Sequence, residues 1–246
     1  MKSKPRIVAL LTGRGNNTLK DKNILPVFGK PLLYYPATEA KNVASIHDYF
    51  VSSDDSQILD SANKLGYTKI VRPNEYARPD SLHVDVIDHA LSVMKSDFDC
   101  VPDILIVFLA NTVMVKSLWI LNCINNLLNK PELTACVPVY REMDHHPYRA
   151  KKINTDGHLV SSFDFSEENT STNRQDLPPN YFLCHNFWVL NLNTIDRSKG
   201  IAPWTFMGDK VEPYIVEQAF DVHTREDLKV CERWLVQQNM IPSNAK

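Results

Sequence analysis

The chain has 246 residues, of which 43% are hydrophobic and 23% are charged. This length and composition suit one sizeable globular α/β domain, with room for a small appended lobe. Its 27 basic and 29 acidic residues give a formal net charge of −2, so neither nucleic acid nor an anionic membrane is expected as a partner. Any phosphate-binding site must therefore be a local feature, built from a few placed cations and backbone amides.

The first residues and the cysteines predict a soluble, cytoplasmic protein. The apolar run that follows Pro5 is too short for a signal peptide or a membrane span. The five cysteines lie far apart and form no CxxC pair, which is typical of reduced, buried thiols.

The predicted elements in the first part of the chain alternate between short apolar runs and helical patterns. Strands are expected at residues 6–11, 48–52, 69–71, 104–109 and 135–140, and helices at 56–65, 84–94 and 117–128. Strands that alternate with helices of this length indicate βαβ units and a mainly parallel sheet. The sequence thus predicts a three-layer, Rossmann-like α/β fold.

This alternation stops after Tyr140. Residues 141–180 are mostly polar, and we interpret them as an inserted arm or small lobe within a single domain of residues 1–246. Returning strands are expected at 187–190 and 214–219, and a closing helix at 225–237. In sheets of this class ligands bind at the carboxyl ends of the strands, which here means residues 12–23, 53–55 and 110–112.

The loop at residues 12–23 is the strongest local signal for phosphate binding. It follows a buried strand directly and carries two glycines together with Arg14, Lys20 and Lys22. Glycine lets a triphosphate approach backbone N–H groups, and the cations offset its charge. The spacing is neither the dinucleotide fingerprint nor a P-loop, so composition alone leaves a solvated surface loop as an equal alternative.

Several segments in order through nearly the whole chain resemble one family. They are Lys22-Asn23-Ile24 with Gly29-Lys30-Pro31-Leu32, then Val51-Ser52-Ser53-Asp54-Asp55, Arg72-Pro73-Asn74-Glu75-Tyr76-Ala77, residues 85–91, His146-Pro147-Tyr148-Arg149, His185-Asn186, and Asp221-Val222-His223-Thr224-Arg225-Glu226-Asp227-Leu228. Together they resemble the CMP-sialic acid synthetase (acylneuraminate cytidylyltransferase) family, which includes enzymes that activate related nonulosonic acids. The resemblance implies a nucleotide-diphospho-sugar-transferase-like fold.

The resemblance also implies a reaction, in which the hydroxyl of an acidic sugar attacks the α-phosphorus of CTP and pyrophosphate leaves. It implies Mg²⁺ as cofactor, with Asp221 as its ligand. The implied catalytic residues are Lys22, Arg14, Asp221 and His223; the implied nucleotide-binding residues are Thr12, Gly13, Gly15, Asn16, Asn23, Asp54 and Arg72; and the implied sugar-binding residues are Thr112, Tyr148, Arg149, His185 and Asn186. Lys22 as a surface charge, Asp221 as a neighbour of a helix N-cap and Arg72 as half of a structural ion pair remain alternatives.

The chain departs from the family pattern at several positions. Asn16-Asn17 replaces the Ser-Lys of the first loop, Ala110-Asn111-Thr112-Val113-Met114 replaces Gln-Pro-Thr-Ser-Pro, and Leu82-His83 replaces a pair of serines on the sugar side. His223 stands where the family has a second Asp, and imidazole is a poor ligand for Mg²⁺. His223 acting as a base, contacting the sugar or only capping the next helix all remain open.

The resemblance makes residues 141–180 the arm that reaches a partner subunit, and so predicts a homodimer. Tyr148, Arg149, Lys151 and Lys152 would then supply contacts for a carboxylate, although the two lysines fit a solvated basic segment equally well. Other acceptors remain open, for example a 3-deoxy-octulosonate-like acid or a phosphonate. A non-catalytic homologue that binds a sugar nucleotide is the alternative outside the enzyme class.

Overall fold

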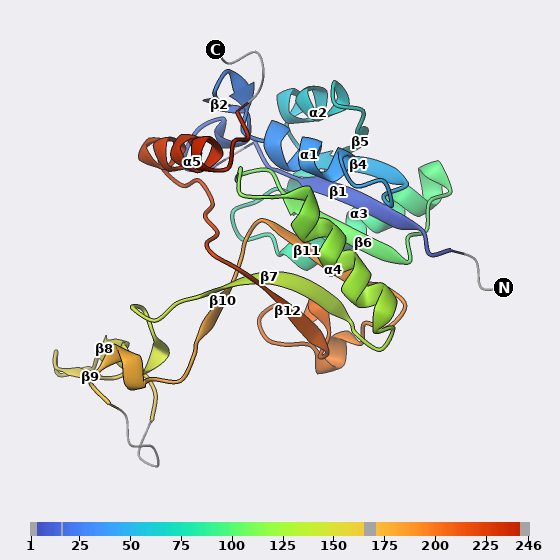
Figure 1. The fold of residues 1–246 in the computed structure, drawn as a ribbon. Coiled ribbons are helices and arrows are strands. Elements are labelled where there is room, and N and C mark those ends of the chain that lie inside the picture. Colours follow the sequence, from blue (N-terminus) through green and yellow to red (C-terminus); the bar gives the residue numbers. More distant parts are fainter. Residues whose placement is uncertain (1–3, 16, 165–170, 242–246) are drawn as a thin grey trace.

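A computed structural model describes residues 4–15, 17–164 and 171–241. Its centre is an eight-stranded sheet in the order β10-β7-β11-β6-β1-β4-β5, with β12 paired to β7 (Figure 1). The strands are β1 (Ile7–Thr12), β4 (Asp48–Ser53), β5 (Thr68–Val71), β6 (Ile104–Leu109), β7 (Ala135–Arg141), β10 (Tyr181–Leu183), β11 (Phe187–Asn191) and β12 (Val211–Val216).

The parallel half of the sheet is built around β1. This strand pairs in parallel with β4 on one side and β6 on the other, and β4 pairs in parallel with β5. The register sets Thr12 opposite Ser52 and also opposite Leu109, so the carboxyl ends of β1, β4 and β6 lie level. In the other half, β11 and β10 pair antiparallel with their neighbours, whereas β12 runs parallel to β7.

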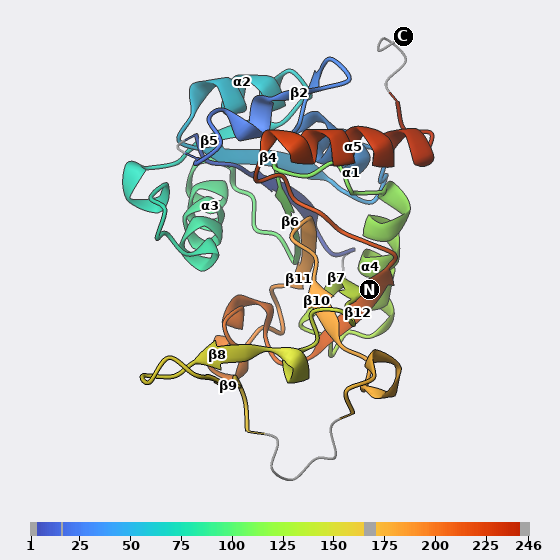
Figure 2. The same cartoon turned by 90° about the vertical axis from the view of Figure 1, so that its left-hand side faces the viewer.

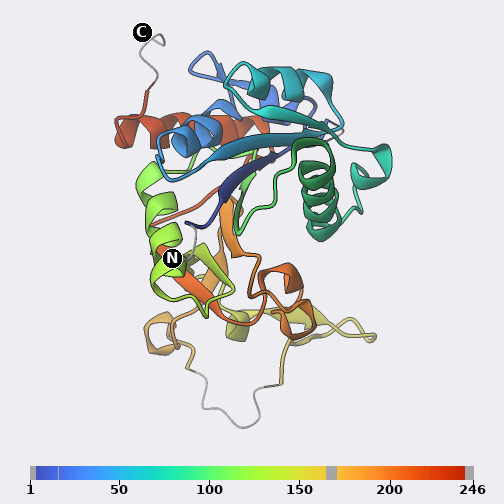
Figure 3. The same ribbon diagram turned by 90° about the vertical axis from the view of Figure 1, so that its right-hand side faces the viewer.

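Helices cover both faces of the sheet, because the strands are apolar on both. Along β1, Ala9 and Leu11 belong to one apolar cluster and Val8 and Leu10 to another. The first cluster is covered by α1 (Tyr34–Lys41), α2 (Ser56–Asn63) and α4 (Ser117–Asn129), and the second by α3 (His83–Phe98). Figures 2 and 3 show α3 on the face opposite α1 and α2.

The last helix, α5 (Arg225–Gln237), packs on a small hairpin near the start of the chain. This hairpin consists of β2 (Pro26–Val27) and β3 (Lys30–Pro31). Trp234 and Leu235 of α5 share an apolar cluster with Val27 and Leu32. The carboxyl-terminal part of the chain is thereby tied to the segment that follows β1.

The described residues between β7 and β10, 142–164 and 171–180, project from the sheet as an arm. The arm contains a hairpin of β8 (Lys151–Ile153) and β9 (Leu159–Ser161), which lies at the end of the molecule away from α2 and α5 (Figures 1 and 2). Ile153 and Leu159 are 71% and 73% exposed. The arm therefore presents apolar side chains that the rest of the described chain leaves open to solvent.

The structure confirms the predicted Rossmann-like α/β class, and corrects the bounds of some elements. The strand expected at 214–219 covers Val211–Val216 instead, because its parallel pairing with β7 sets Val211 opposite Ala135. The helix expected at 84–94 extends over His83–Phe98, whereas α1 was not predicted. Within the described residues no helix has both the length and the apolar character needed to cross a membrane.

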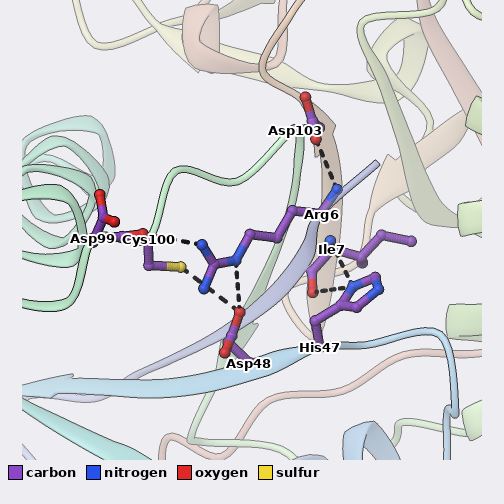
Figure 4. A network of polar contacts seen from close by, with 7 residues as sticks. All are labelled: Arg6, Ile7, His47, Asp48, Asp99, Cys100 and Asp103. Carbon is purple, nitrogen blue, oxygen red and sulfur yellow. Dashed lines mark hydrogen bonds and ion pairs between the residues drawn. The ribbon is translucent and has the colours of Figure 1, made fainter. Parts of the chain in front are cut away.

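A polar network ties together the amino ends of β1, β4 and β6, at the edge of the sheet opposite the strand carboxyl ends (Figure 4). The Arg6 Nε atom lies 2.9 Å from Asp48 Oδ2, and the Arg6 backbone N–H donates to Asp103 Oδ2 at 2.7 Å. Asp103 also accepts from Asn193 Nδ2 at 3.0 Å. These hydrogen bonds hold the pKa of the Asp103 carboxyl below its usual range, the bond from Asn193 having the larger effect.

We predict that Asp103→Asn lowers the free energy of unfolding by about 1 kcal/mol at about pH 7, because two hydrogen bonds to a partly buried carboxylate are weakened. The folded-state pKa of Asp103 is depressed, so its stabilisation is present above the unfolded pKa and is lost as the pH falls through the folded pKa. The difference between variant and wild type should therefore shrink toward zero in acid. Urea unfolding of variant and wild type at about pH 7 and in acid measures this difference in the free energy of unfolding, with Asp99→Asn as the control. A difference that does not change with pH would contradict the role given to the Asp103 carboxylate.

Candidate active site

A cavity of about 450 Å³ opens at the carboxyl ends of β1, β4 and β6, a volume typical of small-molecule sites. Of the segments predicted for this edge, residues 12–23 and 110–112 contribute to it and residues 53–55 do not; residues 72–83 and the segment before α5 also contribute. Its lining is Thr12, Gly13, Arg14, Asn17, Lys22, Asn23, Arg72, Tyr76, Arg78, Pro79, Ser81, His83, Val86, Leu109, Asn111, His185, Asp221 and His223.

Two hydrogen bonds fix the backbone of the first loop. The Gly15 N–H donates to Asp54 Oδ1, in the loop after β4, at 3.0 Å, and the Asn23 Nδ2 group donates to the Arg14 carbonyl at 2.9 Å. A Cβ atom at Gly15 would lie 2.6 Å from a carboxylate oxygen of Asp55, so glycine is required there by close packing. The Gly15 amide and the buried Asn23 side chain are therefore used within the protein, at Arg14 and immediately after it.

Lys22 begins the short 3-10 helix η1 (Lys22–Ile24) and lines the cavity. Burial lowers the pKa of Lys22; the carboxylate of Asp221 raises this pKa and the charge of Arg14 lowers it. Among the described residues, the ammonium group forms no hydrogen bond and no ion pair within 4 Å. Its charge is thus only partly compensated by the protein.

Arg72 follows β5 and is only 5% exposed. Its Nε and Nη2 atoms donate to Ser52 Oγ at 3.1 Å and to the Ser52 carbonyl at 2.6 Å. Burial lowers the pKa of Arg72 to about 10, against the opposing effect of Asp54. Ser52 is neutral, and no carboxylate of the described chain lies within ion-pair distance of Arg72, so the expected alternative of a structural ion pair is not what the structure shows.

Asp221 lies in the segment between β12 and α5 and lines the cavity. Its Oδ2 atom accepts from Asn111 Nδ2 at 3.1 Å and lies 2.9 Å from His223 Nε2. The backbone N–H of His223 donates to Asp227 Oδ2 at 2.8 Å, next to the capping box of α5. The His223 backbone therefore supports the start of α5, while its ring orients the Asp221 carboxylate.

Other residues expected at the site use their polar atoms inside the protein or lie elsewhere. Thr12 and Thr112 donate to the carbonyls of Phe108 and Phe220 at 3.0 and 2.6 Å. Asn186 donates to the Met114 carbonyl at 3.0 Å. Thr112, Asn186, Gly15 and Asp54 do not line the cavity, Tyr148 and Arg149 lie in the arm on η3 (Pro147–Arg149), and Asn16 falls outside the described residues.

Two parts of the cavity were not predicted as site residues. One is Asn111, which contacts Asp221 across 110 positions of sequence. The other is the wall formed by Tyr76, Arg78, Ser81 and His83. The sequence did carry a signal for this wall, since Leu82-His83 breaks the resemblance at the sugar side.

Comparison with known proteins identifies the family. A family model described as cytidylyltransferase matches residues 14–188, which is well over half of the chain. The chain belongs to the cytidylyltransferase family. The match begins in the first loop and ends at residue 188, shortly after His185, and so includes most of the cavity lining.

Two curated relatives of this chain carry related names. An N-acylneuraminate cytidylyltransferase from Streptococcus agalactiae serotype V is 23% identical over 87% of this chain and 49% of its own length. A Helicobacter pylori protein named pseudaminic acid cytidylyltransferase and UDP-2,4-diacetamido-2,4,6-trideoxy-beta-L-altropyranose hydrolase is 23% identical over 80% of this chain and 36% of its own length. The chain thus spans about half or less of the curated relatives it matches.

Two solved structures share the fold of this chain. A CMP:2-keto-3-deoxy-manno-octonic acid synthetase complexed with CTP superposes with a TM-score of 0.67 at 16% identity, over 95% of this chain and 99% of the other. A 4-diphosphocytidyl-2C-methyl-D-erythritol synthase from Anaerococcus prevotii superposes with a TM-score of 0.64 at 15% identity, over 94% and 99%. At this identity the likeness concerns the fold, which agrees with the nucleotide-diphospho-sugar-transferase-like class expected from the sequence.

Proposed function

We propose that the protein transfers CMP from CTP to a hydroxyl of an acidic sugar. The acceptor oxygen attacks the α-phosphorus, the bond from that phosphorus to the pyrophosphate oxygen breaks, and the hydroxyl proton passes to water. This chemistry needs charge neutralisation and in-line positioning more than covalent participation of the protein.

The observation that carries the proposal is the unbalanced positive charge in the cavity. Lys22, Arg72 and Arg14 line it together, and Asp221 is the carboxylate among the described lining residues. Burying cations without nearby anions is unfavourable, as the lowered pKa values of Lys22 and Arg72 reflect. A triphosphate would supply the missing negative charge, with its oxygens on the Arg72 and Arg14 guanidinium groups and the Lys22 ammonium.

The acidic-sugar acceptor is supported by the names of the relatives, N-acylneuraminate and pseudaminic acid cytidylyltransferase. The structural neighbour that takes 2-keto-3-deoxy-manno-octonic acid favours an octulosonate-like acceptor as a second candidate. His185, predicted to contact the sugar, lines the same cavity as Lys22.

Pyrophosphate release from CTP with Mg²⁺, measured across a panel of nonulosonic acids, octulosonic acids and phosphonates, tests the proposal. Release with one class of acid supports it and identifies the acceptor. CTP binding without release for every acid would replace it by the non-catalytic alternative. Absence of CTP binding in calorimetry would overturn it altogether.

Lys22→Ala should lower kcat/KM for pyrophosphate release at least about tenfold, because a cation that faces the phosphates in the transition state is removed. Lys20→Ala is the matched control, since Lys20 lies in the same loop but is exposed and does not line the cavity. It should keep kcat/KM within about twofold of wild type, as expected of an exposed charge. Equal losses in the two variants would show that only the general charge of the loop matters.

We propose Mg²⁺ as the cofactor, held by Asp221 together with phosphate oxygens of CTP. Mg²⁺ prefers oxygen ligands and is commonly bound by one or two carboxylates plus substrate phosphates. Asp221 fits this requirement, because it lines the cavity and its orientation is set by Asn111 and His223. No cluster of three or more His, Cys, Asp or Glu suited to a metal occurs among the described residues. When bound, the ion would neutralise charge on the phosphates.

His223→Asp should tighten Mn²⁺ binding in the presence of CTP by about tenfold, because it adds a second carboxylate oxygen donor beside Asp221. His223→Asn, which adds no charge, should change the affinity by less than about threefold on the same grounds. Free Mn²⁺ is measured by electron paramagnetic resonance, independently of turnover. An unchanged affinity in His223→Asp would exclude metal binding beside Asp221.

We propose that the arm mediates a homodimer. The support is its projection from the sheet (Figure 1) and the exposure of Ile153 and Leu159 on the β8–β9 hairpin. Contiguous exposed apolar side chains of this kind mark interaction surfaces. In a dimer, Tyr148 and Arg149 of this arm would be carried toward the partner subunit.

Ile153→Glu combined with Leu159→Glu should convert the dimer to monomer in sedimentation velocity, because two charges would be buried at the interface. Val101→Glu is the control. Val101 is also exposed and apolar, but it precedes β6, at the amino ends of the strands and outside the arm. A wild-type monomer at micromolar concentration would refute the proposal.

A further inference from the structure

An ammonium and a carboxylate line the cavity without forming an ion pair. Lys22 and Asp221 both belong to the lining. Burial lowers the pKa of Lys22, and the Asp221 carboxylate is near enough to raise it. Yet among the described residues the ion-pair contact of Asp221 within 4 Å is with His223, not with Lys22. Because opposite charges in a partly buried cavity attract each other, a separate contact must hold the two groups apart.

Asn111, in the loop after β6, supplies this contact. Its Nδ2 group donates to Asp221 Oδ2 at 3.1 Å, in a partly buried position. The backbone carbonyl of Asn111 accepts from the Val222 N–H at 2.8 Å. One residue thus binds both the main chain next to Asp221 and one oxygen of its carboxylate.

Thr112 anchors the same segment on the other side of Asp221. Its hydroxyl donates to the Phe220 carbonyl at 2.6 Å and accepts from the Met114 N–H at 3.0 Å. Thr112 is fully buried, so water does not compete for these bonds. Since residues 220 and 222 are both tied to the loop after β6, the backbone of Asp221 is fixed. The direction of its side chain is then left to the groups that bind the carboxylate.

His223 is the other group that contacts the Asp221 carboxylate. Its Nε2 atom lies 2.9 Å from Oδ2, the oxygen that Asn111 also binds. The side chain of His223 is 68% exposed, against 25% for Asp221, and contacts to such an exposed group contribute little. Asn111 is therefore the stronger restraint. Among the described residues no hydrogen bond or ion pair engages Asp221 Oδ1.

We propose that Asn111 is a positioning residue that holds the Asp221 carboxylate away from the Lys22 ammonium. Kept apart, the ammonium stays available to phosphate oxygens, and Asp221 Oδ1 stays available to a cation. The inference rests on the proposed function, in which both groups serve CTP. A carboxylate released from Asn111 would pair with Lys22, and phosphate would then have to displace it.

Two departures of the chain from its family pattern meet at this carboxylate. Asn111 stands where the pattern has Pro, and His223 where it has Asp. Proline has no side-chain donor, so the amide contact with Asp221 belongs to this chain and not to the general pattern. Both changed residues contact the same oxygen, Asp221 Oδ2, which is what a local replacement of one arrangement of the carboxylate by another requires.

The test measures CTP binding by calorimetry in EDTA, so that no metal ion contributes. Asn111→Ala removes the amide but keeps the backbone carbonyl that binds Val222. The Kd for CTP should rise about threefold, because phosphate must then compete with a partly exposed ion pair for Lys22. A crystal structure of this variant should place Lys22 Nζ within about 4 Å of the Asp221 carboxylate, the ion-pair distance.

The Asp221→Ala background separates positioning from a general structural role. Asp221→Ala should bind metal-free CTP at least as tightly as wild type, since a carboxylate that repels phosphate is removed. Adding Asn111→Ala to this background should change the Kd by less than about 1.5-fold, because the partner through which Asn111 acts is absent. A structural effect of Asn111 would persist in the double variant.

Asn122→Ala is the matched control. The Asn122 Nδ2 group also donates to a distant side chain, Tyr214 Oη at 3.0 Å, but Asn122 lies outside the cavity lining. Its loss should leave the Kd for CTP within about 1.5-fold of wild type, as expected of a remote site. Thermal unfolding of each variant identifies any loss of fold, which would weaken CTP binding with and without Asp221.

Three results would overturn the inference while leaving the cytidylyltransferase proposal intact. They are an unchanged Kd in Asn111→Ala, an equal rise in the presence and absence of Asp221, and a variant structure in which Lys22 and Asp221 stay apart. Failure of wild type to bind CTP would instead overturn the proposed function, and this inference with it.

Discussion

The register of β1 between β4 and β6 is the constraint on which the rest of the structure depends. All three strands are parallel and buried on both faces, so their carboxyl ends lie level and release three loops at one edge. Of the cations in the described chain that line the cavity, Arg14 and Lys22 lie in the loop after β1, and Arg72 and Arg78 lie in the segment after β5. A shift of one residue along β1 would move the glycine-bearing loop away from Arg72 and turn its side chains to the other face.

The site built on this register contains more positive than negative charge. Lys22 and Arg72 are held by backbone geometry and by hydrogen bonds to neutral groups, not by carboxylates. The protein alone therefore bears an electrostatic strain that an anionic ligand relieves, and the same arrangement pre-orients the donors before the ligand arrives.

Much of this could be predicted from the sequence, because local patterns carry it. The apolar runs at β1 and β6 and the helical period of α5 depend on short-range periodicity, and their bounds agree closely with the structure. The loop after β1 was recognisable from its glycines and cations. The end of β12 could not be predicted, since its pairing with β7 in the folded chain decides where the strand ends. Helix α1 could not be predicted either, because it has neither a side-chain cap nor a strong amphipathic pattern. Contacts between distant residues, such as Asn111 with Asp221 or the His83 and His185 rings with Trp188, are properties of the folded chain. They leave no local pattern in the sequence.

The segment after β12 lies against the loop after β6, and this contact brings a carboxylate to the cavity. The Val222 N–H donates to the Asn111 carbonyl at 2.8 Å, and the Thr112 hydroxyl donates to the Phe220 carbonyl. Because a chain is synthesised from its amino terminus, Arg14, Lys22 and Arg72 leave the ribosome before Asp221. The cavity therefore acquires the carboxylate of Asp221 only when the segment after β12 has docked on the loop after β6.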